Sequence, residues 1–192
     1  MNRTKRHFVL AASSLAALSL LPACTTTGSG GGDPEAQRKA IDAGVDSALA
    51  RLYSQQRGSK ELVESARGVL VLPSFGSAGF IVGGGSGRGV LRVGDKSDGY
   101  FRMTEASVGL LAGAQSQAVF LLFMTDNALN RFRNSSGWTI GADANVSMLT
   151  VGANAQITSQ TAQQEVIGFV MTNSGLMGNI SLNGNRVTRL GL

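Results

Sequence analysis

The first regular pattern in the body of this chain is an apolar stripe at helical spacing. Ile41, Val45, Ala48 and Leu52 recur every three or four residues, with Leu49 beside them. The stripe follows Asp33-Pro34, where Asp suits an N-cap and Pro the first helical position. The pattern predicts a long helix from residue 34 to about 57. A short second helix is expected over 59–67, capped by Ser59 and with Leu62, Val63 and Ala66 facing inward.

Beyond Gly68 the apolar positions form the short runs typical of strands. Pro73 is expected to end the first run, and the glycine-rich stretch 83–89 to form a loop. A run over 118–124 is apolar on both faces, which predicts a central strand, and Thr125 or Asp126 should cap a short helix after it. The predicted strands are 68–73, 78–82, 90–93, 106–115, 118–124, 138–156, 166–171, 176–182 and 186–190.

Helices followed by strands predict the α+β class. The expected fold has N-terminal helices packed on a strongly curved, mainly antiparallel, glycine-rich sheet or barrel-like β-structure, with one short inserted helix. About 160 residues suit a single domain, here residues 34–192.

The N-terminus carries a targeting signal. Basic residues at positions 3, 5 and 6 precede an apolar run from Phe8 to about Leu21, and Ala23 precedes Cys24, the only cysteine. This is the layout of a secretory signal peptide, and the run is shorter than the ~20 residues that a membrane-spanning helix needs. Leu21-Pro22-Ala23-Cys24 fits a lipobox with Pro22 as the one departure. The sequence therefore predicts a signal peptide over 1–23, lipidation at Cys24 and a flexible linker over 24–33.

The alternative is an ordinary secretory signal with an incidental cysteine, which would leave a free thiol in an oxidising compartment. Thr25 stands where an Asp would retain a Gram-negative lipoprotein at the inner membrane. The expected location is therefore the bacterial cell envelope, lipid-anchored to the outer membrane and facing the periplasm. Stable anchoring needs more than one acyl chain, which a diacylated and N-acylated cysteine supplies.

Cleavage before Cys24 also limits the chemistry. His7, the only histidine, leaves with the signal, so the mature chain lacks imidazole and free thiol, and no catalytic triad, Cys–His dyad or usual zinc site can form. No catalytic residue, metal or cofactor is predicted. Three of the 17 basic residues also leave, so 14 remain against 12 acidic ones, a net charge of +2. Without a basic cluster interleaved with aromatics, no nucleic-acid partner is expected.

The sequence offers two other candidate sites, a glycine-rich stretch and a single aspartate. The stretch 83–89 fits neither phosphate-binding glycine motif, so its glycines are read as permitting positive φ, bulges or close backbone approach in a bent sheet. Arg88 within it is the one loop residue able to meet an anionic headgroup, although an exposed turn arginine is the commoner explanation. Asp143 as a catalytic acid would need a second carboxylate, and no spacing pairs it with Glu105, Asp126 or Glu165. A solvated sheet face accounts for Asp143.

The order of several segments resembles the SYLF domain family. The segments are Ala66-Arg67-Gly68-Val69-Leu70-Val71-Leu72-Pro73, Ala78-Gly79-Phe80-Ile81-Val82-Gly83-Gly84, Gly87-Arg88-Gly89-Val90-Leu91, the block 107–115, the helical residues 128–132 and the block 174–184. The resemblance covers nearly all of the body from the first helix onward.

The resemblance implies a non-enzymatic lipid-binding module. Eukaryotic relatives bind phosphoinositides and some act with actin, whereas bacterial members are commonly secreted lipoproteins. For a periplasmic protein the transferable property is affinity for anionic or phosphorylated lipid headgroups. In the family this contact is attributed to basic N-terminal helical residues, for which the equivalents here are Arg38, Lys39, Arg57 and Lys60. A scaffold lipoprotein that binds an envelope protein through an exposed sheet edge is the alternative.

Overall fold

The computed structural model describes residues 33–79, 82–108, 113–148, 163–172, 175–176 and 182–192. All of them belong to one compact unit, Gly32–Leu192. Both hydrophobic clusters and the described hydrogen bonds lie inside this unit, so it carries its own core. The predicted signal peptide, Cys24 and the linker up to residue 32 lie outside the described residues, and the linker and domain limits stay predictions.

Twelve helices and strands make up the described part of the unit. The helices are α1 (Pro34–Gln55), α2 (Ser59–Ser65) and α3 (Asp126–Asn134). The strands are β1 (Gly68–Gly79), β2 (Val82–Val93), β3 (Lys96–Val108), β4 (Gly113–Phe123), β5 (Trp138–Thr139), β6 (Ser147–Met148), β7 (Val166–Thr172), β8 (Gly175–Leu176) and β9 (Arg186–Arg189).

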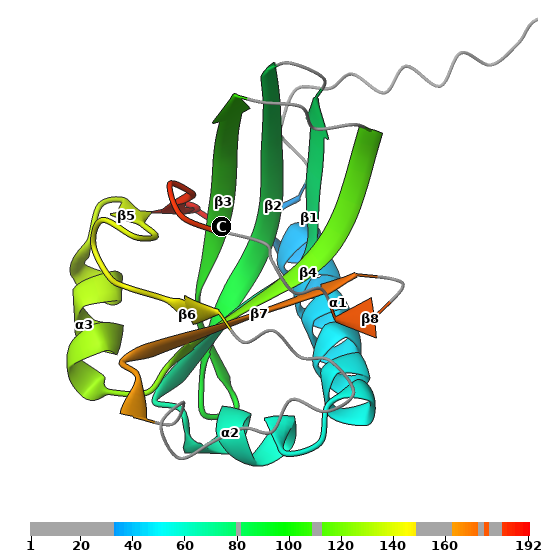
Figure 1. Cartoon of the computed structure of the whole chain (residues 1–192). Coiled ribbons are helices and arrows are strands. Elements are labelled where there is room, and N and C mark those ends of the chain that lie inside the picture. Colours follow the sequence, from blue (N-terminus) through cyan, green and yellow to red (C-terminus); the bar gives the residue numbers. More distant parts are fainter. Residues whose placement is uncertain (1–32, 80–81, 109–112, 149–162, 173–174, 177–181) are drawn as a thin grey trace, which may run out of the picture. The chain divides into compact units, whose positions relative to one another are not determined.

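The described strands form one nine-stranded sheet in the order β5-β9-β3-β2-β1-β4-β7-β6, with β8 paired to β7. Every pairing is antiparallel except that of β6 with β7. The sheet curls, so that β7 crosses in front of the long strands, and one end of β1–β4 projects past the helices (Figure 1). The fold-class prediction is confirmed: an α+β domain with helices on a curled, mainly antiparallel sheet.

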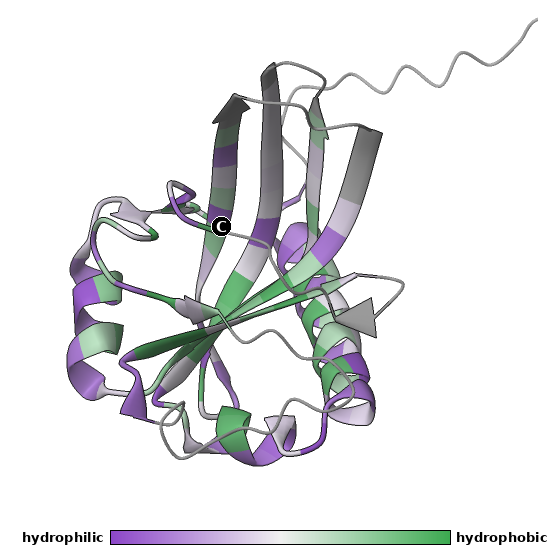
Figure 2. Ribbon diagram, in the orientation of Figure 1, coloured by the Kyte–Doolittle hydropathy of each residue, from purple (hydrophilic) through white to green (hydrophobic). Residues whose placement is uncertain are grey.

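The long first helix forms as its apolar stripe predicts. The Asp33 side chain accepts a hydrogen bond from the Glu35 backbone N–H at 3.0 Å, and Pro34 occupies the first turn. The buried residues of α1 are Ile41, Val45, Ala48 and Leu52. They pack on the sheet together with strand residues such as Met171 of β7, and hydrophilic residues alternate with these apolar ones along the helix (Figure 2).

The predicted cap of α2 is wrong by one residue. Gly58, with φ +77°, is the N-cap and makes no side-chain cap bond. Ser59 is instead buried, and its hydroxyl donates to the backbone oxygens of Leu52 (3.2 Å) and Gln56 (2.7 Å). The helix also ends at Ser65, two residues before the predicted end. Leu62 is buried, and Val63 and Ala66 lie half-buried against the core.

Pro73 does not end its strand, contrary to the prediction. β1 continues to Gly79 because Pro73 lies at a β-bulge, where the pairing register shifts between Val71 and Ser74 toward β2 and between Leu72 and Phe75 toward β4. A proline has no backbone N–H to donate, and at a bulge the ladder does not need one. Of the strand predicted over 78–82, residues 78 and 79 belong to the end of β1 and Val82 begins β2, while residues 80–81 lie outside the described residues.

The predicted loop over 83–89 is also wrong, because these glycines lie inside β2. None of them has positive φ, so close backbone approach is what they provide. A Cβ on Gly87 would lie 2.7 Å from the Ser74 carbonyl oxygen, and one on Gly89 would collide with the Val71 carbonyl. The glycines therefore let β2 pack against β1 where the sheet bends.

Three further strand predictions need correction. The sequence reading does not predict β3 before residue 106. Of the strand predicted over 106–115, residues 106–108 end β3 and residues 113–115 begin β4, while residues 109–112 lie outside the described residues. The predicted strand over 138–156 contains only the short β5 and β6 within its described residues, separated by a turn around Gly141. Its residues 149–156, and 177–181 of the strand predicted over 176–182, lie outside the described residues.

The remaining elements agree with the predictions. Thr125 caps α3 by accepting from the Ala128 N–H at 3.2 Å. β4 is central, between β1 and β7, and its residues from Ala118 to Phe123 are fully or almost fully buried. On the side of the sheet opposite α1, Phe132 of α3 packs against Phe101, Phe123 and Trp138. The sheet thus has one hydrophobic cluster on each side.

Candidate functional site

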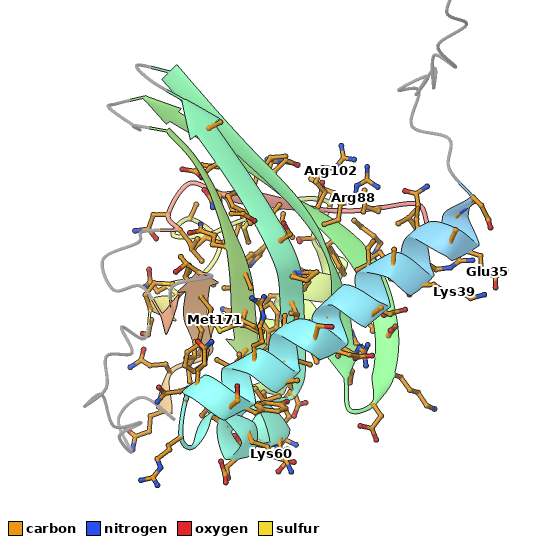
Figure 3. The ribbon with its side chains drawn as sticks, turned by 90° about the vertical axis from the view of Figure 1, so that its right-hand side faces the viewer. Glu35, Lys39, Lys60, Arg88, Arg102 and Met171 are labelled. Carbon is orange, nitrogen blue, oxygen red and sulfur yellow. The ribbon has the colours of Figure 1, made fainter. Side chains whose placement is uncertain are left out.

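The two predicted lipid-binding lysines lie at opposite ends of α1. Lys39 is in its second turn and forms an ion pair with Glu35 at 2.8 Å. Lys60 belongs to α2 and pairs with Glu64 at 3.9 Å. α1 has 22 residues and is therefore about 33 Å long. Figure 3 shows the lysines separated by most of this length. All four side chains are more than 60% exposed, so each lysine is free to exchange its partner.

The two predicted arginines also lie apart. Arg57 is exposed in the turn between α1 and α2. Arg38 is half-buried on the flank of α1 that faces β3, where its positive charge acts to lower the pKa of Tyr100. Burial and the hydrogen bond to Asp42 outweigh this effect and raise the pKa of Tyr100. The structure therefore does not gather the four predicted residues into one site.

A polar junction fixes α1 over the β2–β3 hairpin. Asp42 of α1 accepts hydrogen bonds from Tyr100 Oη at 2.7 Å and Ser97 Oγ at 3.0 Å. Arg92 of β2 lies between Asp42 (3.5 Å) and Asp46 (2.9 Å). These contacts place the middle turns of α1 across β2 and β3, and the two acidic residues neutralise Arg92.

Four residues further out along the hairpin, two arginines face each other. Arg88 of β2 and Arg102 of β3 are directly opposite in the antiparallel register. The Arg88 guanidinium donates to Gln37 Oε1 of α1 at 2.8 Å, which places the pair on the side of the sheet that α1 covers. Both side chains extend from neighbouring strands beside the first half of the helix (Figure 3). Like charges in this position repel.

Among the described strand residues in register with the two arginines, several carry hydroxyl groups and none carries a carboxylate. In the strand register one row runs Thr188, Arg102, Arg88, Ser74, and the next runs Arg186, Thr104, Ser86, Gly76, Ser116. We call these two rows the arginine face. A shallow groove of about 350 Å³ borders it, between the first half of α1 and strands β1 and β2, lined by Ala40, Ile41, Pro73, Ser74, Ser86, Gly87 and Arg88.

Several other arginines of the described chain are neutralised by carboxylates. Arg133 pairs with Asp98, Arg131 with Glu165 and Arg67 with Asp126, whereas Arg38, Arg57, Arg186 and Arg189 form no ion pair among the described residues. Within the described residues neither Arg88 nor Arg102 forms an ion pair, and Arg102 Nε is buried without a hydrogen-bond partner. The arginine face is therefore electropositive and suited to an anion.

The carboxylates weighed as catalytic acids have separate structural roles. Asp143 is exposed in the turn after β5 and accepts from the Thr139 backbone N–H at 2.6 Å, so the prediction that it lies on a sheet face is wrong. Asp126 and Glu165 hold arginines, as described above. In the described segments no group of three or more His, Cys, Asp or Glu side chains is placed to hold a metal ion. Across those same segments, no helix is both long and apolar enough to span a membrane.

Comparison with known proteins supports the resemblance found in the sequence. The family model Ysc84, described as Las17-binding protein actin regulator, matches residues 104–190. This match confirms the resemblance to the SYLF domain family over that part of the chain. SYLF domains are binding modules associated with lipid and with protein interaction, including actin-related scaffolding. No curated protein matches the chain.

Sequence reasoning found half of the arginine pair. The sequence predicts a loop around Arg88, and it does not single out Arg102 because β3 is not predicted there. The sequence does contain a pattern that indicates this strand. Polar residues at 100, 102 and 104 alternate with the apolar Phe101 and Met103. This alternation puts Arg102 on the same face as Tyr100. Its position opposite Arg88 depends on the hairpin register.

Proposed function

We propose that this protein is a lipid-anchored, non-enzymatic SYLF protein of the bacterial envelope whose domain contacts anionic lipid headgroups. Acylation at Cys24 would hold the domain at the membrane. The proposed location is the outer membrane, with the domain facing the periplasm. Envelope organisation or lipid handling is the proposed role.

The observation that carries this proposal is the position of the arginine face beside the start of α1. Pro34 begins α1 ten positions after Cys24, and Gln37 in its first turns contacts Arg88. A membrane anchor on that tether would bring the unneutralised arginines near headgroups. Each basic residue near an anionic surface contributes about 1 kcal/mol, screened by salt. The anchor raises the effective concentration of such weak contacts at the membrane.

The predicted contacts Arg38, Lys39, Arg57 and Lys60 remain part of the proposal. Lys39, Arg57 and Lys60 are exposed, and the two lysine ion pairs are of the surface type that costs little to break. Because Arg38 and Lys39 lie near the start of α1 and Arg57 and Lys60 lie beyond its end, they would act as separate weak contacts rather than as one site.

Co-sedimentation with vesicles tests the proposal. Residues 28–192, which lack the lipid, are mixed with phosphatidylcholine vesicles or with vesicles containing phosphatidylglycerol, at low and physiological salt. Salt-sensitive binding to the anionic vesicles is expected, with weaker binding after charge reversal at Lys39, Arg57 and Lys60. Intact binding in that variant would remove these three residues from the contact surface. Absence of binding at both salt concentrations would reject headgroup contact by the domain.

A second candidate function is a scaffold that binds an envelope protein by strand addition. In the described residues, β9 pairs with β3 only over Phe101–Thr104, and β7 pairs with β4 only from Gln117 onward. The projecting ends of β3 and β4 thus have no described neighbour on their outer edges, and such edges can accept another strand. Binding of an envelope protein that survives high salt, without vesicle binding, would favour this function.

A further inference from the structure

Arg88 and Arg102 are placed to act as one unit. They are directly opposite on neighbouring antiparallel strands, where Cβ atoms lie about 5 Å apart. Arg88 is exposed and Arg102 is half-buried, so an anion approaching from solvent meets both guanidinium groups. We propose that these two arginines form a clamp for the terminal phosphate of a phosphate monoester.

The charge balance favours an anion between them. Two guanidinium groups side by side repel, and no described carboxylate forms an ion pair with either of them. Arg92, on the same face of β2, has Asp42 and Asp46 against its guanidinium, although its Nε, like that of Arg102, is buried without a hydrogen-bond partner among the described residues. The fold supplies carboxylates to Arg92 and none to Arg88 or Arg102. A bound anion would supply the missing negative charge.

The number of donors selects a monoester over a diester. A guanidinium binds phosphate oxygens in a two-pronged fork, and two adjacent forks suit a group with three terminal oxygens. A phosphate monoester has three such oxygens and carries about −1.5 to −2 charges at neutral pH. A phosphodiester carries a single charge on two terminal oxygens, which one fork already satisfies. The second arginine therefore gives the site its preference for a phosphate monoester over a phosphodiester.

The flanking residues are compatible with this ligand. Ser74 and Thr188 stand at the two ends of the same row, and neither is acidic. Gln37 Oε1, which accepts from Arg88 at 2.8 Å, is a neutral acceptor. A charged phosphate oxygen is a stronger acceptor than an amide and would take over this donor.

This inference deepens the proposed function by naming the headgroup chemistry, but it rests on the geometry of the arginine pair. The phosphate monoester can belong to a lipid, such as phosphatidic acid, or to a soluble molecule, such as glycerol 3-phosphate. The chemistry at the clamp is the same, so the experiment contains an arm for each source.

The lipid arm compares vesicles of equal net surface charge that contain either phosphatidic acid or phosphatidylglycerol. Residues 28–192 are tested as wild type, as R88Q/R102Q, as R102K and as the control R67Q/K96Q, which removes the same number of charges at two exposed residues outside the proposed contacts. Circular dichroism and the thermal midpoint establish that each variant is folded. The soluble arm follows backbone amide NMR shifts of β2 and β3 during titration with glycerol 3-phosphate or with its diester glycerophosphocholine.

The clamp predicts tighter binding to phosphatidic acid than to phosphatidylglycerol. R88Q/R102Q should lose about tenfold or more in that binding, the change expected when one charge-assisted hydrogen bond is lost. R102K should keep salt-sensitive binding but lose the preference, because lysine lacks the fork. R67Q/K96Q should keep both the binding and the preference for phosphatidic acid.

The vesicle and soluble-ligand experiments together distinguish a wrong clamp assignment from a wrong proposed function. Equal binding to both vesicle types, or an unchanged preference in R88Q/R102Q, would overturn the clamp while leaving headgroup contact in place. Binding of glycerol 3-phosphate that depends on Arg88 and Arg102, without vesicle binding, would support the clamp and reject the membrane role. If the protein binds neither glycerol 3-phosphate nor vesicles, both the clamp and the membrane role are rejected.

Discussion

Tyr100 of β3 donates its phenolic hydrogen to Asp42 of α1, with 2.7 Å between Oη and Oδ2. This bond connects the first half of the helix to the hairpin that carries Arg88 and Arg102. Ser97 and Arg92 reach the same carboxylate, so Asp42 gathers three donors. The position of α1 relative to the arginine face therefore depends on this junction.

Removal of the Tyr100 hydroxyl should weaken the junction. Tyr100→Phe is expected to lower the free energy of unfolding by about 1–2 kcal/mol, because a hydrogen bond to a charged acceptor is lost. Urea denaturation followed by circular dichroism measures the change. Tyr53→Phe is the matched control, since no described side chain hydrogen-bonds to Tyr53. Equal stabilities for the two variants would contradict the assigned role.

Tyrosine ionisation gives a pH test. The pKa of Tyr53 is raised by burial and then by Glu64, and that of Tyr100 by burial and then by its bond to Asp42. A group with a raised folded pKa holds its proton more tightly in the native state. Its contribution to stability is complete below the ordinary value of 10.0 and is lost as pH rises through the folded pKa.

Ultraviolet titration of phenolate absorbance checks this expectation. The chain has two tyrosines, and both should ionise above pH 10.0 when native and near that value in urea. Tyr100→Phe should leave a single native transition, that of Tyr53. Native ionisation below the unfolded value would show that the environments described for these side chains are wrong.

A methyl group at Gly89 should disturb the pairing of β1 and β2. Its Cβ would collide with the Val71 carbonyl, so Gly89→Ala is expected to cost about 1–3 kcal/mol through forced backbone shifts. Gly76→Ala is the control, because a Cβ there meets nothing within 4 Å. That change should stay within about 0.5 kcal/mol. The thermal midpoints of the two variants are measured side by side. A similar decrease in midpoint for both would argue against a close approach of the backbones at Gly89.

Phe132 is expected to be a major contributor to the core on the α3 side. It lies 4.8 Å from the ring centroids of Phe101 and Phe123 and 5.4 Å from that of Trp138. Phe132→Ala should lower the free energy of unfolding by about 3–5 kcal/mol through lost burial and the cavity left behind.

Fluorescence adds a local measurement to this variant. Trp138 is the only tryptophan and is 2% exposed, so its native emission should shift to longer wavelength when Phe132 no longer covers it. An unchanged emission maximum together with a small loss of stability would show that α3 is not packed on Trp138.

The sequence by itself determined the elements whose signals are local. The stripe from Ile41 to Leu52 specified α1, Asp33 and Thr125 specified helix starts, and the doubly apolar run in β4 specified a central strand. Each depends on side-chain periodicity or a cap, which neighbouring residues set. The α+β class followed from their order along the chain, and the order of the glycine-bearing segments carried the resemblance to the SYLF family, which the family match confirmed.

Only the tertiary structure decided how the glycines and arginines are used. Gly87 and Gly89 are strand residues because Ser74 and Val71 of β1 lie against them, and Pro73 is tolerated because the bulge removes the need for its donor. Arg88 and Arg102 become one electropositive pair only through the β2–β3 register, and Arg92 is neutralised only because α1 crosses the hairpin. These relations join residues distant in sequence, and strand register and helix docking, rather than local propensity, fix them.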